Sequence, residues 1–336
     1  MGTYKKKFAA ILSILIFPGA FAQDRNDYKV VKTFHIASPG GWDYIAVHNK
    51  KLYVSHGTQV NILDELTGDS ISVIPNTTGV HGIAFDDELN KGFTSNGRSN
   101  NVTVFDLTTN QVLSQIATGE NPDAILYDHF SKKIITCNGR SNDVSIIDPS
   151  SGKVVARVPV GGKPETAVTD SEGKLYVNVE DKNQIAEINL KTFAVENHWS
   201  ILPGEGPTGL AFDKNTRRLF AGCNKLLIVL DPSNGKIIDK ITIGSGCDGV
   251  VFDNSYKMIF TSNGEGNVTA VKEQSPYEFK VLQTIATKKG ARTITINETT
   301  HTLYLPTADF EAPDLNAAPN TRPKMVPGTF QVLVVQ

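Results

Sequence analysis

The stretch FTSNGRSNNVTVFD, residues 93–106, holds two short runs of β-forming residues on either side of a polar Asn-Gly turn. It recurs as ITCNGRSNDVSIID at residues 135–148, in the next part of the chain. Two near-identical β-hairpins that follow one another indicate an internal repeat, and a repeat of this kind determines the fold of the whole chain.

The repeat extends over most of the chain as seven units of about 40 residues. Each unit contains four short segments of β-type composition, and no segment shows a sustained helical period of apolar residues. This pattern predicts an all-β, seven-bladed β-propeller with four antiparallel strands in each blade. Corresponding residues near the start of each unit, called the ring positions here, are Asp43, His81, Asp123, Glu165, Thr208, Asp248 and Arg292.

The turns after the third strand have a defined chemistry in several units, and the sixth unit breaks the pattern at residues 272–276. Asp106 is followed by Asn110, and Asp148 is followed at the same spacing by Gly152. An Asp side chain at this position accepts hydrogen bonds from backbone N–H groups two or three residues on, and Asn or Gly supplies the left-handed residue of a tight hairpin. We therefore expect an Asp-stabilised turn in these units.

Counting strands predicts how the ring closes. The seventh unit has strands at 293–296, 302–305 and 330–335, and then the chain ends one strand short. A matching strand is present near the other terminus, at residues 28–36. Pairing this N-terminal strand with the last blade removes two exposed sheet edges. We therefore expect the two termini to close the ring, with residues 23–336 forming a single propeller domain.

The first 22 residues have the features of a cleaved signal peptide. Three lysines at 5–7 precede a short apolar run at 8–17, and Ala20-Phe21-Ala22 provides the small residues of a cleavage site. The apolar run is too short to span a bilayer. The mature protein is thus expected in the periplasm or outside the cell, without a membrane span. A net charge of −2 and a pI of 6.4 argue against a nucleic-acid partner.

The three cysteines are too few for a disulfide framework. Cys223 ends the second strand of the fifth unit, and Cys247 begins the sixth, so a bridge between them stays open as an option. Cys137 is expected to be a core thiol. Nothing in the sequence calls for a second copy of the chain, and a monomer is expected.

Several motifs resemble those of YVTN-repeat propellers, in particular LYVSHG at 52–57, FTSNG at 93–97 and 260–264, and NVTVFD at 101–106. The segment TRPKMVPGTF at 321–330 resembles the last blade of YncE-like exported bacterial proteins. The resemblance covers nearly the whole mature chain. It implies a seven-bladed propeller in the cell envelope but no settled activity, since a fold does not fix a function.

The ring positions form a candidate ligand site at one mouth of the central channel. Four of them are carboxylates that face one narrow space, which raises their pKa values or calls for a cation. They could bind a small polar ligand, or a hard metal such as Ca²⁺ or another divalent cation. The alternative is a water-filled mouth with solvated side chains. The candidate ligand-binding residues are Asp43, His81, Asp123, Glu165, Asp248 and Arg292.

Two further features lie on the same predicted face. Arg98 and Arg140 occupy equivalent turns of neighbouring units, where they could hold a carboxylate or phosphate, or could simply be solvated repeat copies. The proline-rich segment 308–328 replaces a short turn in the last unit. Long loops in compact domains are usually functional or disordered, and we expect here a lid or a partner-binding arm.

Two functions remain open at this point. The first is a non-catalytic, exported binding protein whose partner is a small polar ligand or an envelope protein; this function needs no cofactor. The second is a metal-dependent, lactonase-like hydrolase in which the carboxylates of the mouth hold a divalent cation. No residue stands out as catalytic, and the spacing of the histidines does not match a nucleophilic triad.

Overall fold

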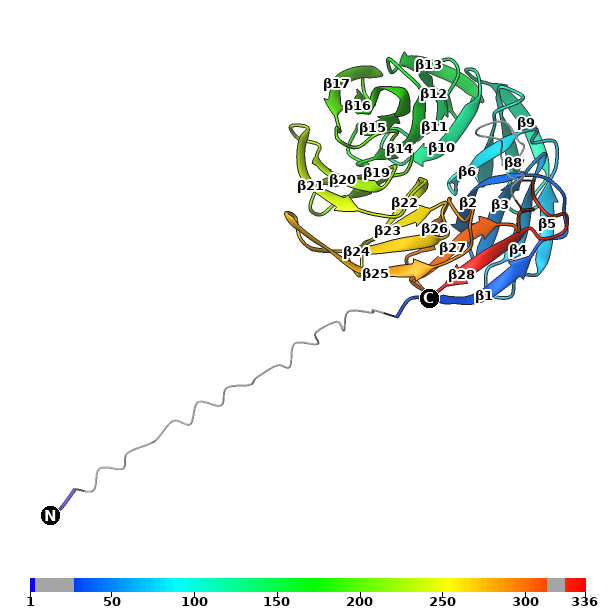
Figure 1. Cartoon of the computed structure of the whole chain (residues 1–336). Helices are drawn as coiled ribbons and strands as arrows, with labels where there is room; N and C mark the ends of the chain where they lie inside the picture. The colour runs from blue at the N-terminus through cyan, green and yellow to red at the C-terminus, as the bar shows by residue number, and fades with distance from the viewer. Residues whose placement is uncertain (4–26, 313–323) are drawn as a thin grey trace.

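A computed structural model of the chain describes residues 1–3, 27–312 and 324–336. The described strands form seven four-stranded antiparallel sheets arranged as blades around a central axis (Figure 1). The prediction of a seven-bladed propeller is confirmed. The predicted signal peptide falls almost entirely outside the described residues.

Each complete blade takes four consecutive strands, from the innermost to the outermost. Blades one and two contain β2 (Trp42–His48), β3 (Lys51–His56), β4 (Gln59–Asp64), β5 (Ser70–Ile74), β6 (Val80–Asp86), β7 (Lys91–Asn96), β8 (Asn101–Asp106) and β9 (Val112–Ala117). Blades three and four contain β10 (Pro122–Asp128), β11 (Lys133–Asn138), β12 (Asp143–Asp148), β13 (Lys153–Pro159), β14 (Pro164–Thr169), β15 (Lys174–Val179), β16 (Gln184–Asn189) and β17 (Ala194–Ser200). Blades five and six contain β18 (Leu210–Asp213), β19 (Arg218–Cys223), β20 (Leu226–Asp231), β21 (Lys236–Thr242), β22 (Cys247–Asp253), β23 (Met258–Asn263), β24 (Asn267–Ser275) and β25 (Glu278–Ala286).

The seventh blade combines the two ends of the chain. Its strands are ordered β26 (Thr295–Asn297), β27 (Thr302–Thr307), β28 (Gln331–Val335) and β1 (Val30–His35) from the axis outward. The antiparallel register of β1 and β28 runs from Val30 opposite Val335 to His35 opposite Gln331. Figure 1 shows this pair as a blue strand beside a red one. The predicted closure of the ring by the termini is confirmed.

The described chain has little helix, as expected. A 3₁₀ turn, η1 (Glu180–Lys182), follows β15. Among the described residues, no helix is long and apolar enough to span a lipid bilayer. Cys137, Cys223 and Cys247 are buried free thiols, so the bridge that the sequence leaves open between Cys223 and Cys247 is not formed.

The Asp-stabilised turns form as predicted. Oδ1 of Asp106 accepts hydrogen bonds from the backbone N–H groups of Thr108 and Thr109, at 2.9 and 2.7 Å. Asn110 then takes the left-handed conformation with φ of 59°. These bonds stabilise the carboxylate and lower the pKa of Asp106. Such turns hold the third and fourth strands of a blade together at the face opposite the ring positions.

A β-bulge recurs at the ring positions. In β6, Val80 pairs with Asn96, and the regular register resumes only at Ile83 opposite Thr94. The same break occurs near the starts of β2, β10, β14 and β22. A bulge redirects the side chain at the interruption. The repeat thus turns its ring residues out of the sheet and toward the axis, at the end where β7 turns into β8.

Side chains of three second strands, β7, β15 and β23, bond to the backbone of the next blade at its ring position. Ser95 Oγ accepts a hydrogen bond from Gly82 N at 2.8 Å and donates one to the backbone oxygen of Asp123 in the following blade. Asn178 Nδ2 donates to the backbone oxygen of Thr208 at 3.1 Å, and Ser262 Oγ donates to that of Arg292. In these three blades the polar residue one before the end of the second strand therefore fixes the spacing to the next ring position.

Candidate functional site

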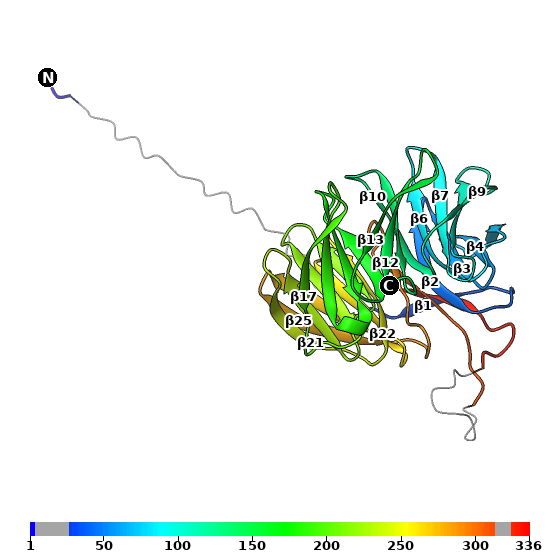
Figure 2. The same cartoon turned by 90° about the horizontal axis from the view of Figure 1, so that it is seen from above.

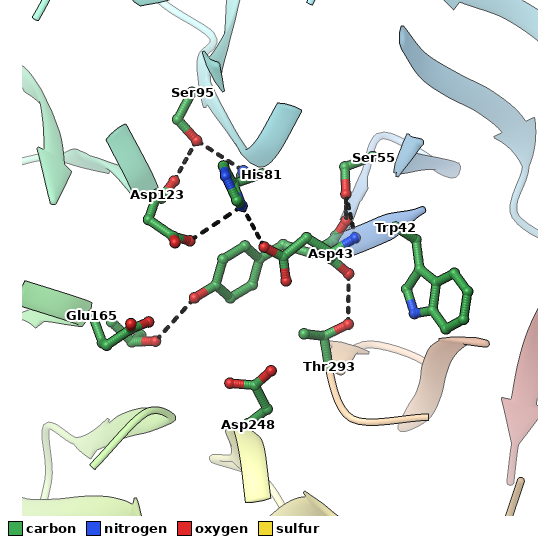
Figure 3. Close-up of polar contacts among 12 residues, drawn as sticks. Trp42, Asp43, Ser55, His81, Ser95, Asp123, Glu165, Asp248 and Thr293 are labelled. Atoms are coloured by element: carbon green, nitrogen blue, oxygen red, sulfur yellow. Dashed lines mark hydrogen bonds and ion pairs between the residues drawn. The ribbon is translucent and has the colours of Figure 1, made fainter. Parts of the chain in front are cut away.

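The closest contact among the ring positions joins three blades. His81 Nδ1 lies 2.5 Å from Asp43 Oδ2 and 3.6 Å from Asp123 Oδ1 (Figure 3). The three side chains are largely buried, with 25, 16 and 15% of the side-chain surface of His81, Asp43 and Asp123 exposed. They come from the equivalent bulges of β2, β6 and β10, which are neighbours around the axis. The predicted meeting of these three residues therefore occurs.

On the opposite side of Asp43, Arg292 bridges two carboxylates. Its Nε lies 2.7 Å from Asp248 Oδ2, and its Nη2 lies 3.3 Å from Asp43 Oδ1. Thr293 Oγ1 donates to the backbone oxygen of Asp43 at 2.6 Å and so joins the last blade to the first. The structure therefore places Asp248 and Arg292 in one network with Asp43.

Glu165 has a cationic partner that the sequence did not reveal. Lys163 Nζ lies 2.5 Å from Glu165 Oε1 and also contacts Glu180 Oε2. Glu180 belongs to η1, in the turn between β15 and β16 of the same blade. The helical turn of the fourth blade thus supplies a second carboxylate to the same lysine. The positive charge of Lys163 is therefore divided between Glu165 and Glu180.

Burial and mutual repulsion shift the pKa values in this network. Burial lowers the pKa of His81, but the hydrogen bond to Asp43 and the charges of Asp123, Asp43 and Glu165 outweigh it and raise that pKa to about 8. Burial, followed by the charge of Asp43, raises the pKa of Asp123. Burial and the charge of Asp123 raise the pKa of Glu165. At neutral pH these three side chains therefore bind protons more strongly than they would in water, as expected where several carboxylates share too few nearby cations.

Tyr44, which is not among the candidate residues named from the sequence, reaches across the axis. It follows Asp43 in β2 of the first blade, and its hydroxyl lies 3.4 Å from Thr166 Oγ1 in β14 of the fourth blade. Its ring packs against the apolar cluster of blades three and four. Burial, then the charges of Asp123, Asp43, Glu165 and Asp248, raise the pKa of its hydroxyl, which keeps its proton. Tyr44 is thus part of the floor of the mouth.

A signal for Tyr44 was present in the repeat. The position after the ring residue holds a small residue in the other six units: Gly82, Ala124, Thr166, Gly209, Gly249 and Thr293. A large aromatic at a position that is otherwise small marks the place where one blade differs from the rest. The partner of Tyr44 could not be found in this way, because Thr166 is 122 residues away in the sequence.

The remaining sequence candidates do not join the cluster. Thr208 Oγ1 donates to the backbone oxygen of Cys247 at 2.7 Å and acts as a link between blades. Arg98 and Arg140 are exposed on their turns. In the described residues no hydrogen bond or ion pair connects the side chain of either arginine with a ring position or with the other arginine. That the two arginines hold an anion together stays a prediction.

The described part of the 308–328 segment begins as a short ladder beside the mouth. Phe310 and Met325 form an antiparallel bridge, with backbone bonds of 2.8 Å from Glu311 to Lys324 and from Val326 to Asp309. Trp42, the neighbour of Asp43, lies against both Phe310 and Phe330, at 6.0 and 5.3 Å between ring centroids. Figure 2 shows these ends projecting beyond the blades. Residues 313–323, where a lid or arm is predicted, lie outside the described residues.

Comparisons with known proteins identify the fold. No family model and no curated protein matches the chain. The solved structure of Kuenenia stuttgartiensis hydrazine synthase contains a chain that is similar to this one with a TM-score of 0.71, covering 81% of this chain and 94% of that one. Only 13% of the aligned residues are identical. At that identity the similarity establishes a propeller fold and says nothing of activity.

Proposed function

We propose that this chain is an exported, non-catalytic propeller of the YVTN-repeat type that binds a small ligand at the mouth of its channel. The proposed ligand carries positive charge or several N–H donors. The segment at residues 1–22, with its lysines, apolar run and cleavage-site residues, supports export to the periplasm or the medium. The repeat motifs support the family, and the ring positions support the site.

One observation carries this proposal: the carboxylates of the mouth lack a full set of cations. Arg292 forms ion pairs with both Asp43 and Asp248, and Lys163 forms ion pairs with both Glu165 and Glu180. Among the described residues, the ion pair of Asp123 is the 3.6 Å contact with His81, which itself is bonded more closely to Asp43. Largely buried carboxylates without close partners are costly to keep ionised. A ligand that brings positive charge to Asp123 would therefore be stabilised there.

The surroundings of the cluster favour a small ligand. Tyr44 crosses from the first blade to the fourth, next to the ring carboxylates, and occupies space on the axis. The base of the 308–328 segment stands at one side, fixed to Trp42. A ligand would then enter from the mouth and rest on Tyr44.

A melting-temperature screen tests this function. Purified protein is scanned against divalent metals, primary amines, polyamines, sugars and organic acids. A ligand present at 100 times its Kd should add about 2.7 kcal/mol to stability. A ligand of the proposed class should raise the melting temperature of the wild-type protein and leave the melting temperature of Asp123→Asn unchanged. Asp87→Asn, at a carboxylate with 70% of its side chain exposed, is the matched control and should respond like the wild type. A screen without any hit that depends on Asp123 contradicts the proposal.

The metal-dependent hydrolase remains a second candidate because of one observation. A nitrogen of His81 and carboxylate oxygens of Asp43 and Asp123 all lie within 4.8 Å of one another, as metal ligands would. An enzyme of this kind also needs an open coordination position for substrate or water. It predicts hydrolysis of lactones or esters that stops when metal is removed and in Asp123→Asn. The binding function predicts no turnover with any metal.

A further inference from the structure

His81 presents one particular nitrogen to the two carboxylates. A β-carbon placed on Gly97 would lie 2.6 Å from His81 Nε2, so this nitrogen is seated against the turn between β7 and β8. The other nitrogen, Nδ1, faces Asp43 and Asp123. A larger residue than glycine at position 97 would occupy the place of the imidazole. The turn thus sets the direction in which His81 offers its donor atom.

The backbone around the three side chains is held by a shared set of hydroxyls. Ser95 bonds both Gly82 N, next to His81, and the backbone oxygen of Asp123, so one side chain fixes two neighbouring ring positions. Ser55 Oγ accepts from Asp43 N at 3.0 Å, and Thr293 bonds the backbone oxygen of Asp43 (Figure 3). Supporting hydrogen bonds of this kind orient the ligands of metal sites. Each donor therefore has a defined place before any ligand binds.

We propose that Asp43, His81 and Asp123 form a binding site for one divalent transition-type cation, with Zn²⁺ as the representative. This inference rests on the proposed function, since it names the ligand class of the same site. The three residues are the group of metal-ligating side chains found with this spacing in the part of the chain that the structure describes. The cation would take the place of the proton between His81 and Asp43 and would supply the charge that Asp123 lacks.

The donor set also decides between metals. One imidazole nitrogen with carboxylate oxygens suits Zn²⁺ and its transition-metal neighbours, whereas Ca²⁺ and Mg²⁺ prefer ligand sets made entirely of oxygen. Zinc binds nitrogen and oxygen at about 2.0–2.2 Å, which places two ligand atoms about 3.3 Å apart in a tetrahedral site. His81 Nδ1 and Asp43 Oδ2, now at 2.5 Å, would separate on binding, while the 3.6 Å contact to Asp123 needs little change.

Calorimetric titration of metal-free purified protein with ZnCl₂ and, separately, with CaCl₂ tests the inference. One Zn²⁺ should bind per chain, at least 100-fold more tightly than Ca²⁺. His81→Ala and Asp123→Asn should each weaken zinc binding by at least 100-fold. His48→Ala is the matched control, because His48 contacts a single carboxylate, that of Asp87, at 3.0 Å. Urea unfolding of each variant establishes that it is folded. If His81→Ala does not fold, Asp123→Asn, which keeps the side-chain shape, tests the site by itself.

Ser95→Ala separates positioning from ligation. It leaves all three donor side chains in place but removes the bonds that hold two of them in register, so zinc affinity should fall by about 10- to 100-fold. A merely structural role for Ser95 would lower stability and leave the affinity unchanged.

Two outcomes overturn the zinc site: zinc binding that is unaffected by His81→Ala and Asp123→Asn, or zinc binding no tighter than calcium binding. If the zinc site is overturned while another ligand raises the melting temperature of the wild type and not of Asp123→Asn, only the metal inference is wrong. If no ligand of that screen depends on Asp123, the proposed function falls with it.

Discussion

A chain that begins at Ala37 is expected to lose cooperative folding, whereas a chain that begins at Asp27 keeps it. The shorter chain lacks β1 and with it three almost fully buried side chains, Tyr28, Phe34 and Ile36, which are 2, 4 and 5% exposed. Removing a single large apolar side chain from a core costs about 2–5 kcal/mol. The loss of three, together with the ladder of β1, is comparable to the whole stability of a domain, about 5–15 kcal/mol.

The loss also exposes a sheet edge. β28, a fully buried strand with the sequence QVLVV, would become the edge of the seventh blade. Unprotected apolar edges pair with other chains. Urea unfolding followed by circular dichroism, with light scattering as a measure of aggregation, compares the two chains. A synthetic peptide of residues 27–36 added to the shorter chain should restore part of the cooperative transition. Identical unfolding midpoints for the two chains would show that the termini do not close the ring.

Replacing Glu273 by leucine is expected to stabilise the protein at neutral pH, by about 3 kcal/mol. Glu273 is 4% exposed and lies in the extended third strand of its blade, β24, at the position where two other blades have the buried leucines Leu107 and Leu190. Its Oε1 lies 2.7 Å from Thr216 Oγ1, which also lies 2.8 Å from Asp213 Oδ2. A hydroxyl has a single hydrogen, so a neutral Glu273 that donates to Thr216 satisfies both contacts. Its Oε2 is buried and has no partner among the described atoms.

The stabilising effect of Glu273→Leu should depend on pH, because the pKa of Glu273 differs between the folded and unfolded protein. Burial, with a further contribution from Asp213, raises the pKa of Glu273 from 4.5 to about 7 in the folded protein. Folding therefore favours the protonated form. The stability that this group contributes is fully present below pH 4.5 and is lost as the pH rises to 7. The variant carries no such group, so its advantage over the wild type should grow from pH 4.5 to 7 and stay constant above.

Urea unfolding of both proteins at several pH values between 4.5 and 8 measures that difference directly, since the carboxylates of the mouth titrate equally in both. Glu278→Leu, at an exposed position of β25, removes the same charge without the burial and is the matched control. A constant gap between Glu273→Leu and the wild type would mean that Glu273 is ionised in the folded protein throughout this range.

The sequence was sufficient to predict the ring, because the ring is built from local signals repeated seven times. The Asp of the third-strand turn is visible within a short stretch of residues, and the spacing of the units and the missing strand of the last unit follow from comparing the seven copies. Tertiary contacts in the described blades reinforce these signals. For this reason the closure by β1 could be predicted from strand counting alone.

The network inside the mouth could be predicted only in part. That Asp43, His81 and Asp123 meet follows from their equivalent positions in the repeat. The pairing of Lys163 with both Glu165 and Glu180, and the reach of Tyr44 across the axis, depend on side-chain directions that the period does not encode. Arg98 and Arg140 share a motif, and their turns leave both side chains exposed, so their joint binding of an anion stays a prediction.

Diffraction from crystals soaked in ZnCl₂, recorded at the zinc absorption edge, tests the mouth as a ligand site most directly. We expect an anomalous peak between His81 Nδ1 and the carboxylates of Asp43 and Asp123, with Nδ1 and Asp43 Oδ2 moved apart from their 2.5 Å contact. The same soak of Asp123→Asn should give no peak there. Zinc peaks at surface residues only, with the His81–Asp43 contact unchanged in the wild-type protein, would contradict it.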